Sequence, residues 1–146
     1  YFYEPHALQL SNGKIICHLR AENKDETLFT LYQTISSDNG LTWSKPQQIV
    51  RDDSGAPGHL FMHSSGTLIS TFSHRNRPYG IWAIFSEDNG ETWSDESVIF
   101  EGKDTDDLGY PSTIELDDGS LITAFYTREN DYVPALIMQQ KWYIAK

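Results

Sequence analysis

The sequence predicts an all-β protein, a β-propeller built from four-stranded antiparallel blades. Side chains that favour strands are frequent, and Phe, Trp and Tyr alone make up 13% of the residues. No stretch of a dozen residues shows a convincing 3.6-residue hydrophobic period. A glycine-centred segment recurs three times at a period near 50 residues, which is typical of propeller blades. The 146 residues therefore predict about three blades, in repeats over roughly 4–50, 57–100 and 110–146.

A tight hairpin opens each repeat. Its central glycine is Gly13, Gly66 or Gly119, and each copy follows the last by 53 residues. The dipeptides Asn-Gly, Ser-Gly and Asp-Gly are typical of such hairpins, because Gly and Asn tolerate the positive φ angle that the turn requires. One strand precedes each glycine. The strands after the glycines are expected over Ile15–Arg20, Leu68–Ser73 and Leu121–Tyr126.

Two further strands complete each predicted blade. The third strands are expected over Leu28–Ile35, Ile81–Phe85 and Ala135–Gln140, and the fourth strands over Gln47–Val50 and Glu96–Phe100. A propeller closes only with about four or more blades. Three repeats therefore predict part of a larger propeller, or a chain that assembles with other copies, and the start at Tyr1 indicates a fragment or a processed piece.

An eight-residue motif, Ser-x-Asp-x-Gly-x-Thr-Trp, joins the third and fourth strands at 36–43 and again at 86–93. Its Asp carboxylate can accept backbone N–H groups across the turn, while its Gly supplies an unusual φ angle. Its Trp can pack between sheets. The third repeat lacks the motif, or the sequence stops inside it. We expect these residues to stabilise the fold rather than to catalyse a reaction: Asp38, Gly40, Trp43, Asp88, Gly90 and Trp93.

Charge and composition exclude several functional classes. The net charge of −10 argues against nucleic-acid binding, which needs a basic face. The single cysteine, Cys17, rules out an intrachain disulfide and a cysteine-based zinc cluster. No run of 18 apolar residues predicts a membrane span, and residues 1–20 carry no signal-peptide pattern.

Candidate site residues follow from the predicted topology. If the glycine turns and the Asp motifs lie at one rim, the start of each first strand and the end of each second strand meet at the opposite rim, near the channel. The positions nine and seven residues before the glycines hold Glu4, Pro57 and Tyr110, and His6, His59 and Ser112. The positions seven and nine residues after them hold Arg20, Ser73 and Tyr126, and Glu22, Arg75 and Arg128. Strand packing does not require such a set of Glu, Tyr, Arg and His.

The two Asp motifs at blade spacing resemble the Asp boxes, or BNR repeats, of the sialidase (neuraminidase) superfamily, and the resemblance covers essentially the whole chain. It implies a six-bladed propeller of which this sequence resembles roughly the last three blades. It also implies an exo-glycoside hydrolase that releases terminal sialic acid or a related acidic sugar with retention, through a Tyr nucleophile. On this basis Tyr110 is the nucleophile and Glu4 is the base that activates it.

The resemblance also implies an arginine triad that holds the substrate carboxylate. Arg20 matches one arm, and a planar guanidinium suits bidentate carboxylate binding. Another arm is expected from the middle repeat, where Arg75 is favoured by its position and Arg77 is its rival. His6 and His59 are further candidate substrate contacts. Two histidines without a third ligand predict no metal site, and no cofactor is expected.

The family's first triad arginine and its acid/base aspartate are absent from this sequence, so both are expected in the remaining half of the propeller, from the same parent chain or another copy. The expected partner is a sialoglycan or another glycan. The substrate class places the protein outside the cytosol, as a secreted, periplasmic or cell-surface protein.

Simpler interpretations stay open. Glu4 could be an exposed residue near a chain end, and Tyr110 a packed rim aromatic. Arg20 could form an ion pair with Glu22 or Glu26, which contributes little at a surface. The acidic stretch 104–107 is a solvated loop, or else it shapes the site beside Tyr110. The alternative functions are a non-catalytic carbohydrate-binding or scaffold propeller, and a related glycosidase for a different sugar.

Overall fold

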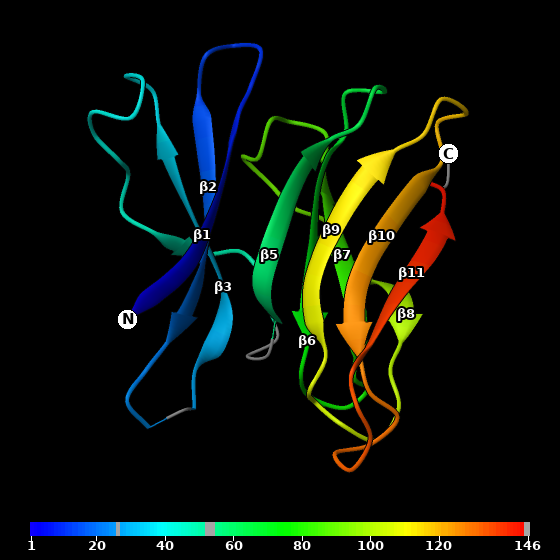
Figure 1. Ribbon diagram of the computed structural model, residues 1–146. Helices are drawn as coiled ribbons and strands as arrows, with labels where there is room; N and C mark the ends of the chain where they lie inside the picture. Colours follow the sequence, from blue (N-terminus) through cyan, green and yellow to red (C-terminus); the bar gives the residue numbers. More distant parts are fainter. Residues whose placement is uncertain (26, 52–54, 145–146) are drawn as a thin grey trace.

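The protein is described by a computed structural model, which covers residues 1–25, 27–51 and 55–144. Within these ranges the chain forms eleven strands in three antiparallel sheets and no helix (Figure 1). This architecture confirms the predicted fold class.

The first two sheets have four strands each and the third has three. The first sheet has the order β1-β2-β3-β4, with β1 (Phe2–Gln9), β2 (Ile15–Glu22), β3 (Phe29–Ser36) and β4 (Gln47–Gln48). The second has the order β5-β6-β7-β8, with β5 (Gly55–Met62), β6 (Leu68–His74), β7 (Gly80–Ser86) and β8 (Ser97–Glu101). The third has the order β11-β10-β9, with β9 (Gly109–Glu115), β10 (Leu121–Thr127) and β11 (Leu136–Trp142).

The fourth strand of the first repeat is shorter than predicted. Regular pairing is confined to β4, two residues rather than the four expected over Gln47–Val50. The backbone N–H of Ile49 still donates to Leu31 O at 3.0 Å, and Thr30 Oγ1 donates to Val50 O at 3.3 Å. The segment therefore follows β3, but a side chain replaces one backbone partner and the regular ladder ends.

The hairpin glycines have the backbone conformation that their sequence context predicts. Gly13, Gly66 and Gly119 have φ angles of 85°, 94° and 77°, in the region that costs other residues steric strain. The turns that contain the Asp boxes lie at the same end of the sheets as these hairpins (Figure 1). The opposite end therefore carries the starts of β1, β5 and β9 and the ends of β2, β6 and β10.

The core lies between neighbouring sheets. Leu31, Val50, Phe72 and Ile84 form a buried cluster between the first and second sheets. Ile69, Ala83 and Leu121 form another between the second and third. Burying such side chains contributes about 1.5–3 kcal/mol each, so each sheet is stabilised mainly by its neighbour, as in other repeat architectures.

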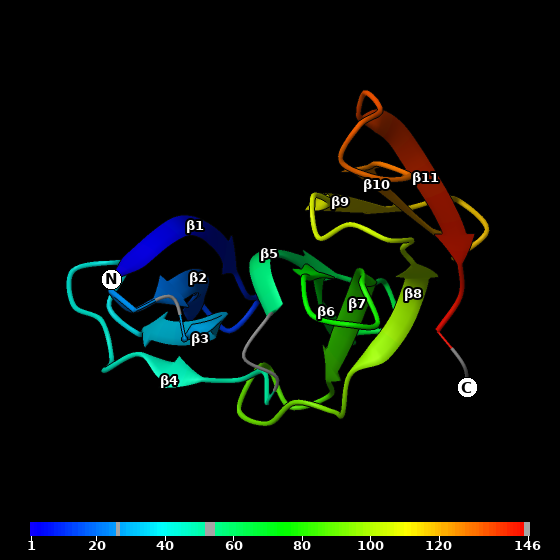
Figure 2. The same ribbon diagram turned by 90° about the horizontal axis from the view of Figure 1, so that it is seen from below.

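The strands β1, β5 and β9 are the inner strands of the three sheets. Viewed along the strands, the three sheets fan outward from these three strands (Figure 2), and β5 contacts both β1 and β9. Residues at equivalent positions of the three inner strands are thus brought together although they are 53 residues apart in sequence.

Each Asp box is closed by its own side chains. Asp38 Oδ1 accepts from Thr42 N at 2.9 Å and Asp38 Oδ2 from Thr42 Oγ1 at 2.5 Å, and Asp88 makes the equivalent bonds to Thr92. The bonds to the threonine hydroxyls, followed by those to the threonine backbone N–H groups, lower the pKa of both carboxyls to about 2. Both aspartates are thus engaged in their turns and distant from the inner-strand starts.

The two Asp-box tryptophans differ. Trp93 packs between the first and second sheets and donates Nε1–H to Gln33 Oε1 at 3.1 Å. Trp43 is 44% exposed, because by the same geometry it faces the side of the first sheet that points away from the second. The expectation that both tryptophans pack between sheets therefore holds here for Trp93 alone.

Candidate functional site

Glu4 and Tyr110 form the centre of the candidate site. They lie on β1 and β9, 106 residues apart, and Tyr110 Oη donates a hydrogen bond to Glu4 Oε1 at 2.5 Å. Both residues have positive φ angles, 48° and 52°, which is uncommon for residues other than glycine. Strained backbone of this kind persists where the surrounding structure holds it, often at functional sites.

A β-bulge in each of the strands β1 and β9 explains how the side chains of Glu4 and Tyr110 reach this position. The register of β1 against β2 shifts between Tyr3 and His6, and that of β9 against β10 shifts opposite Ala124–Tyr126. Bulges redirect side chains at the edges of sheets. In the middle repeat β5 is also bulged, between Gly55 and Gly58, but Pro57 holds the equivalent position, and proline cannot adopt a positive φ.

The hydrogen bond to the Glu4 carboxylate keeps the proton on Tyr110. The hydrogen bond to Glu4 raises the pKa of Tyr110 above its usual value, burial and the charge of Glu4 raise it further, and the charges of Arg75 and Arg20 oppose the change. Tyr110 therefore rests as a phenol at neutral pH. The geometry is that of a weak nucleophile whose proton already points at a base.

Arg20 supports Glu4 from the neighbouring strand β2. Its Nη1 lies 3.2 Å from Glu4 Oε2 and its Nη2 lies 3.4 Å from Glu22 Oε2. Its guanidinium also lies 5.0 Å from the centre of the Tyr3 ring. The predicted pairing with Glu22 is present, but so is a pairing with Glu4 that joins Arg20 to the site; Glu26 lies outside the described residues.

The structure separates the two rival arginines of the middle repeat. Arg75 donates Nε–H to Leu108 O at 3.2 Å and Nη2–H to Tyr126 Oη at 3.5 Å. Arg75 and Arg20 both lie within 6 Å of the Phe29 ring centre, and the charges of both act on Tyr110. Arg75 therefore joins the site.

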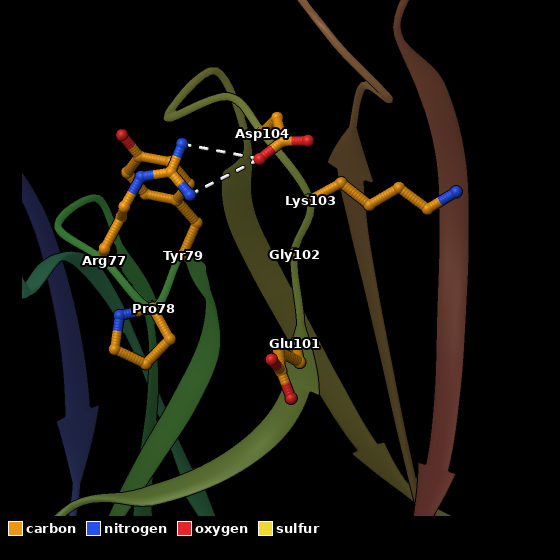
Figure 3. Close-up of a pocket in the computed structure, with 7 residues that line it drawn as sticks. All are labelled: Arg77, Pro78, Tyr79, Glu101, Gly102, Lys103 and Asp104. Carbon is orange, nitrogen blue, oxygen red and sulfur yellow. Dashed lines mark hydrogen bonds and ion pairs between the residues drawn. The ribbon is translucent and has the colours of Figure 1, made fainter.

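Arg77 lies elsewhere, in an outer pocket that Figure 3 shows. There its two terminal nitrogens contact Asp104 Oδ1 at 3.4 Å, its guanidinium lies 5.0 Å from the Tyr79 ring centre, and its side chain is 67% exposed. The residues that line this pocket include none of the other candidate site residues. The structure does not bring Arg77 to Glu4 and Tyr110.

A cavity of about 210 Å³ adjoins the Glu4–Tyr110 pair. It is lined by Glu4, His6, Pro57, Gly58, His59, Tyr110 and Pro111. The rings of His6 and His59 lie 4.4 Å apart. Burial lowers the pKa of His6, and burial followed by the charge of His6 lowers that of His59 to about 4. Both imidazoles are thus neutral near pH 7.

Sequence reasoning assigned no role to three residues beside Tyr110. Tyr126 Oη donates to Asp107 Oδ1 at 2.7 Å, and Arg128 Nε lies 2.7 Å from Asp107 Oδ2. Burial, followed by the bond to Asp107, raises the pKa of Tyr126 to about 12. Tyr126 and Arg128 stood at predicted rim positions, and Asp107 stood in the acidic stretch before β9. Asp107 thus contacts Tyr126, whose ring centre lies 6.1 Å from that of Tyr110, whereas Asp104 and Asp106 of the same stretch are exposed.

Two negative findings concern the part of the chain that the structure describes. It contains no group of three or more His, Cys, Asp or Glu side chains placed to hold a metal ion. No helix there has the length and apolar character needed to cross a membrane.

Comparison with known proteins identifies the family. The model of the family described as a BNR repeat-like domain matches residues 2–123. No curated protein gives a significant match. Because the family match covers most of the chain, it establishes membership independently of the structural likenesses.

Three solved structures show the same fold. A protein of unknown function from Dyadobacter fermentans has a TM-score of 0.83 at 22% identity, over 96% of this chain and 37% of its own. An alpha-L-arabinanase from Penicillium chrysogenum has a TM-score of 0.72 at 20% identity, over 96% of this chain and 45% of its own. A Hadza microbial sialidase has a TM-score of 0.66 at 21% identity, over 93% of this chain and 30% of its own.

The chain spans less than half the length of each of these proteins, and at such identities the likeness concerns the fold alone. Two Asp boxes, three fanned antiparallel sheets and the family match agree. This chain belongs to the family described as a BNR repeat-like domain.

Proposed function

We propose that the protein is a retaining exo-glycoside hydrolase of sialidase type, in which Tyr110 is the nucleophile and Glu4 its base. The observation that carries the proposal is the 2.5 Å hydrogen bond from Tyr110 to Glu4. It joins two inner strands at two strained positions and borders a cavity. A rim aromatic that only packs would need neither the carboxylate partner nor the unusual backbone.

The proposed first step forms a glycosyl–tyrosine bond. Tyr110 Oη attacks the anomeric carbon while its proton passes to Glu4 Oε1, and the bond from that carbon to the leaving oxygen breaks. The leaving oxygen takes a proton from an acid. In the second step water attacks the anomeric carbon and gives a proton to the same acid, now deprotonated, while Tyr110 Oη leaves and takes back its proton from Glu4. Two displacements at one carbon give retention.

Arg20 gives this step its charge balance. Before the reaction Glu4 carries the negative charge, and Arg20 lies 3.2 Å from its second oxygen. As the proton moves, negative charge develops on Tyr110, which remains near Arg20 and Arg75, since both arginines favour the phenolate. Fixed cations near a developing oxyanion stabilise the transition state because they need no reorganisation.

The proposed substrate is a glycan that ends in sialic acid or a related acidic sugar. Arg20 and Arg75 each lie within 6 Å of the Phe29 ring centre, and guanidinium groups bind carboxylates through parallel hydrogen bonds. We place the third arginine and the acid that protonates the leaving oxygen in the part of the propeller that this sequence does not cover. The substrate class favours a secreted, periplasmic or cell-surface protein.

One observation favours a second candidate, a glycosidase for a neutral sugar. Arg20 already contacts two carboxylates and Arg75 already bonds Leu108 O and Tyr126, so part of their capacity for a substrate carboxylate is taken. The arabinanase of similar fold was solved with arabinobiose, a neutral disaccharide, which supports this candidate. A binding propeller without turnover would retain the arginines but gain nothing from the Tyr110–Glu4 bond.

The test compares two fluorogenic substrates, an α-sialoside and an α-L-arabinofuranoside, with the full-length protein and its Tyr110→Phe variant. We expect release from the sialoside and a loss of roughly 10³-fold or more in Tyr110→Phe. Tyr143→Phe, an exposed tyrosine near the hairpin end, serves as the control. Release only from the arabinofuranoside selects the second candidate. No release from either, by folded protein, contradicts both.

A further inference from the structure

We infer that the Nε2–H groups of His6 and His59 form a paired donor subsite that binds hydroxyl oxygens on the uncharged side of the sugar held at Tyr110. The inference rests on the proposed function in placing the reacting sugar at Tyr110, and it adds which part of the sugar the cavity takes. Both imidazoles line the same cavity as Glu4 and Tyr110.

Backbone hydrogen bonds fix the tautomer of both histidines. His6 Nδ1 accepts the N–H of Leu60 at 3.1 Å, and His59 Nδ1 accepts the N–H of Thr113 at 3.3 Å. Each bond runs from an inner strand to a position 54 residues ahead, on the inner strand of the next sheet. A neutral imidazole that accepts at Nδ1 carries its proton at Nε2.

The second ring nitrogen of each histidine remains available. Among the described residues, neither His6 Nε2 nor His59 Nε2 has a hydrogen-bond partner, and both side chains are only half-buried. The rings lie 4.4 Å apart, so two like donors stand side by side on one wall. The lowered pKa values of both groups keep them neutral, and hence keep each a single donor at Nε2, near pH 7.

The charge of the cavity wall selects a neutral ligand group. The lining contains the Glu4 carboxylate but no Arg or Lys. A carboxylate bound there would face Glu4, whose second oxygen is already paired with Arg20, and it would find no further cation among the lining residues. A hydroxyl oxygen, in contrast, can accept from a neutral imidazole. Arg20 and Arg75 gather around Phe29, which is outside this lining. The cavity and the arginines therefore divide the sugar between a hydroxyl side and a charged side.

A simpler role for both histidines is to hold neighbouring inner strands together through Nδ1. Asparagine and glutamine separate the two roles, because an Asn amide oxygen can replace the Nδ1 acceptor and a Gln amide nitrogen can replace the Nε2 donor. We therefore compare His59→Asn with His59→Gln, and His6→Asn with His6→Gln, in the full-length protein. The same pair at His63, which bonds Ser65 and Gly119 near the hairpin end, is the control.

We expect the Asn variants to keep their melting temperature but to lose roughly 3- to 10-fold in kcat/KM on the fluorogenic sialoside, the effect of one neutral hydrogen bond. We expect the Gln variants to keep kcat/KM within about threefold while melting earlier. The reverse pattern, with Asn active and Gln impaired, contradicts the subsite and leaves only the strand-joining role.

A second readout does not depend on turnover. In protein labelled with ¹⁵N-histidine, NMR should show the Nε2–H tautomer for His6 and His59, and their Nε2 signals should move when N-acetylneuraminic acid or arabinobiose binds. A protonated Nδ1, unmoved signals in a sugar complex, or no binding of either sugar contradicts the inference. Binding that moves these signals without hydrolysis would preserve the subsite while ending the proposed catalytic function.

Discussion

The two ends of the sheets use carboxylates differently. At the hairpin end, Asp38 and Asp88 are bonded within their own turns, to residues four positions ahead. At the other end, Glu4 is bonded to Tyr110, 106 residues away, and paired with Arg20 on the next strand. The first arrangement lowers the pKa of the aspartates, and the second raises the pKa of the tyrosine. Local bonds close a turn, whereas the long-range bond places a proton acceptor on a nucleophile.

The largest effect should come from exchanging Glu4 for Gln. Glu4→Gln keeps the shape of the side chain but removes the proton acceptor, so kcat/KM should fall by roughly 10²- to 10⁴-fold, the usual contribution of a general base. The matched change at the hairpin end, Asp88→Asn, should leave kcat/KM of the folded protein unchanged. Steady-state kinetics of both variants make the comparison; equal losses would remove the distinction between the two ends.

The next effect should separate Arg75 from Arg77. Arg75→Lys removes a planar guanidinium from the site, so KM for an acidic sugar should rise roughly 10- to 100-fold, the range for hydrogen bonds to charged groups. Arg77→Lys changes an exposed pair with Asp104 and should leave KM unaltered. A rise for Arg77→Lys alone would reverse the assignment of the arginine.

A smaller effect, on stability rather than activity, is expected at the Asp boxes. Asp88→Ala leaves Thr92 N–H and the Thr92 hydroxyl without their acceptor, so the melting temperature should fall while the activity of the folded protein persists. Glu4→Ala should change the melting temperature less. Thermal unfolding followed by circular dichroism measures both, and a greater loss for Glu4→Ala would show that Glu4 is chiefly structural.

The acid dependence of stability should be the smallest effect. The pKa of Asp38 and Asp88 lies near 2 in the folded protein against an ordinary value of 3.8. Groups whose folded pKa is lowered stabilise the fold above their unfolded pKa and lose that contribution as the pH falls. Stability should therefore decline between about pH 4 and 2. Urea unfolding across this range should show a flatter decline in the double variant Asp38→Asn/Asp88→Asn; an unchanged slope would assign the acid sensitivity to other groups.

Much of this difference between the two ends could be predicted from the sequence. Counting positions from the hairpin glycines brought Glu4 and Tyr110 together because a repeat places equivalent residues at equivalent points of neighbouring sheets. The same counting placed His6 and His59 on one wall. The family resemblance then supplied the chemical roles that spacing alone does not carry.

Other features depend on conformations that a repeat pattern does not encode. Position favoured Arg75, but Arg77 stayed its rival because the direction of each side chain is set by the loop between β6 and β7. The contacts of Asp107 with Tyr126 and Arg128 depend on the path of the loop before β9. The exposure of Trp43 was not expected, because its motif is the same as that of Trp93. The difference arises because the two tryptophans face different surfaces.

The most direct test of the central claim is to trap the intermediate on Tyr110. A sialosyl fluoride with a second fluorine next to the anomeric carbon should form the glycosyl–enzyme readily and hydrolyse slowly, because that fluorine disfavours the cationic transition state. Peptide mass spectrometry of the full-length protein should then find the sugar attached to Tyr110. Attachment to a carboxylate such as Glu4, or turnover of this reagent by Tyr110→Phe at the wild-type rate, would contradict the account.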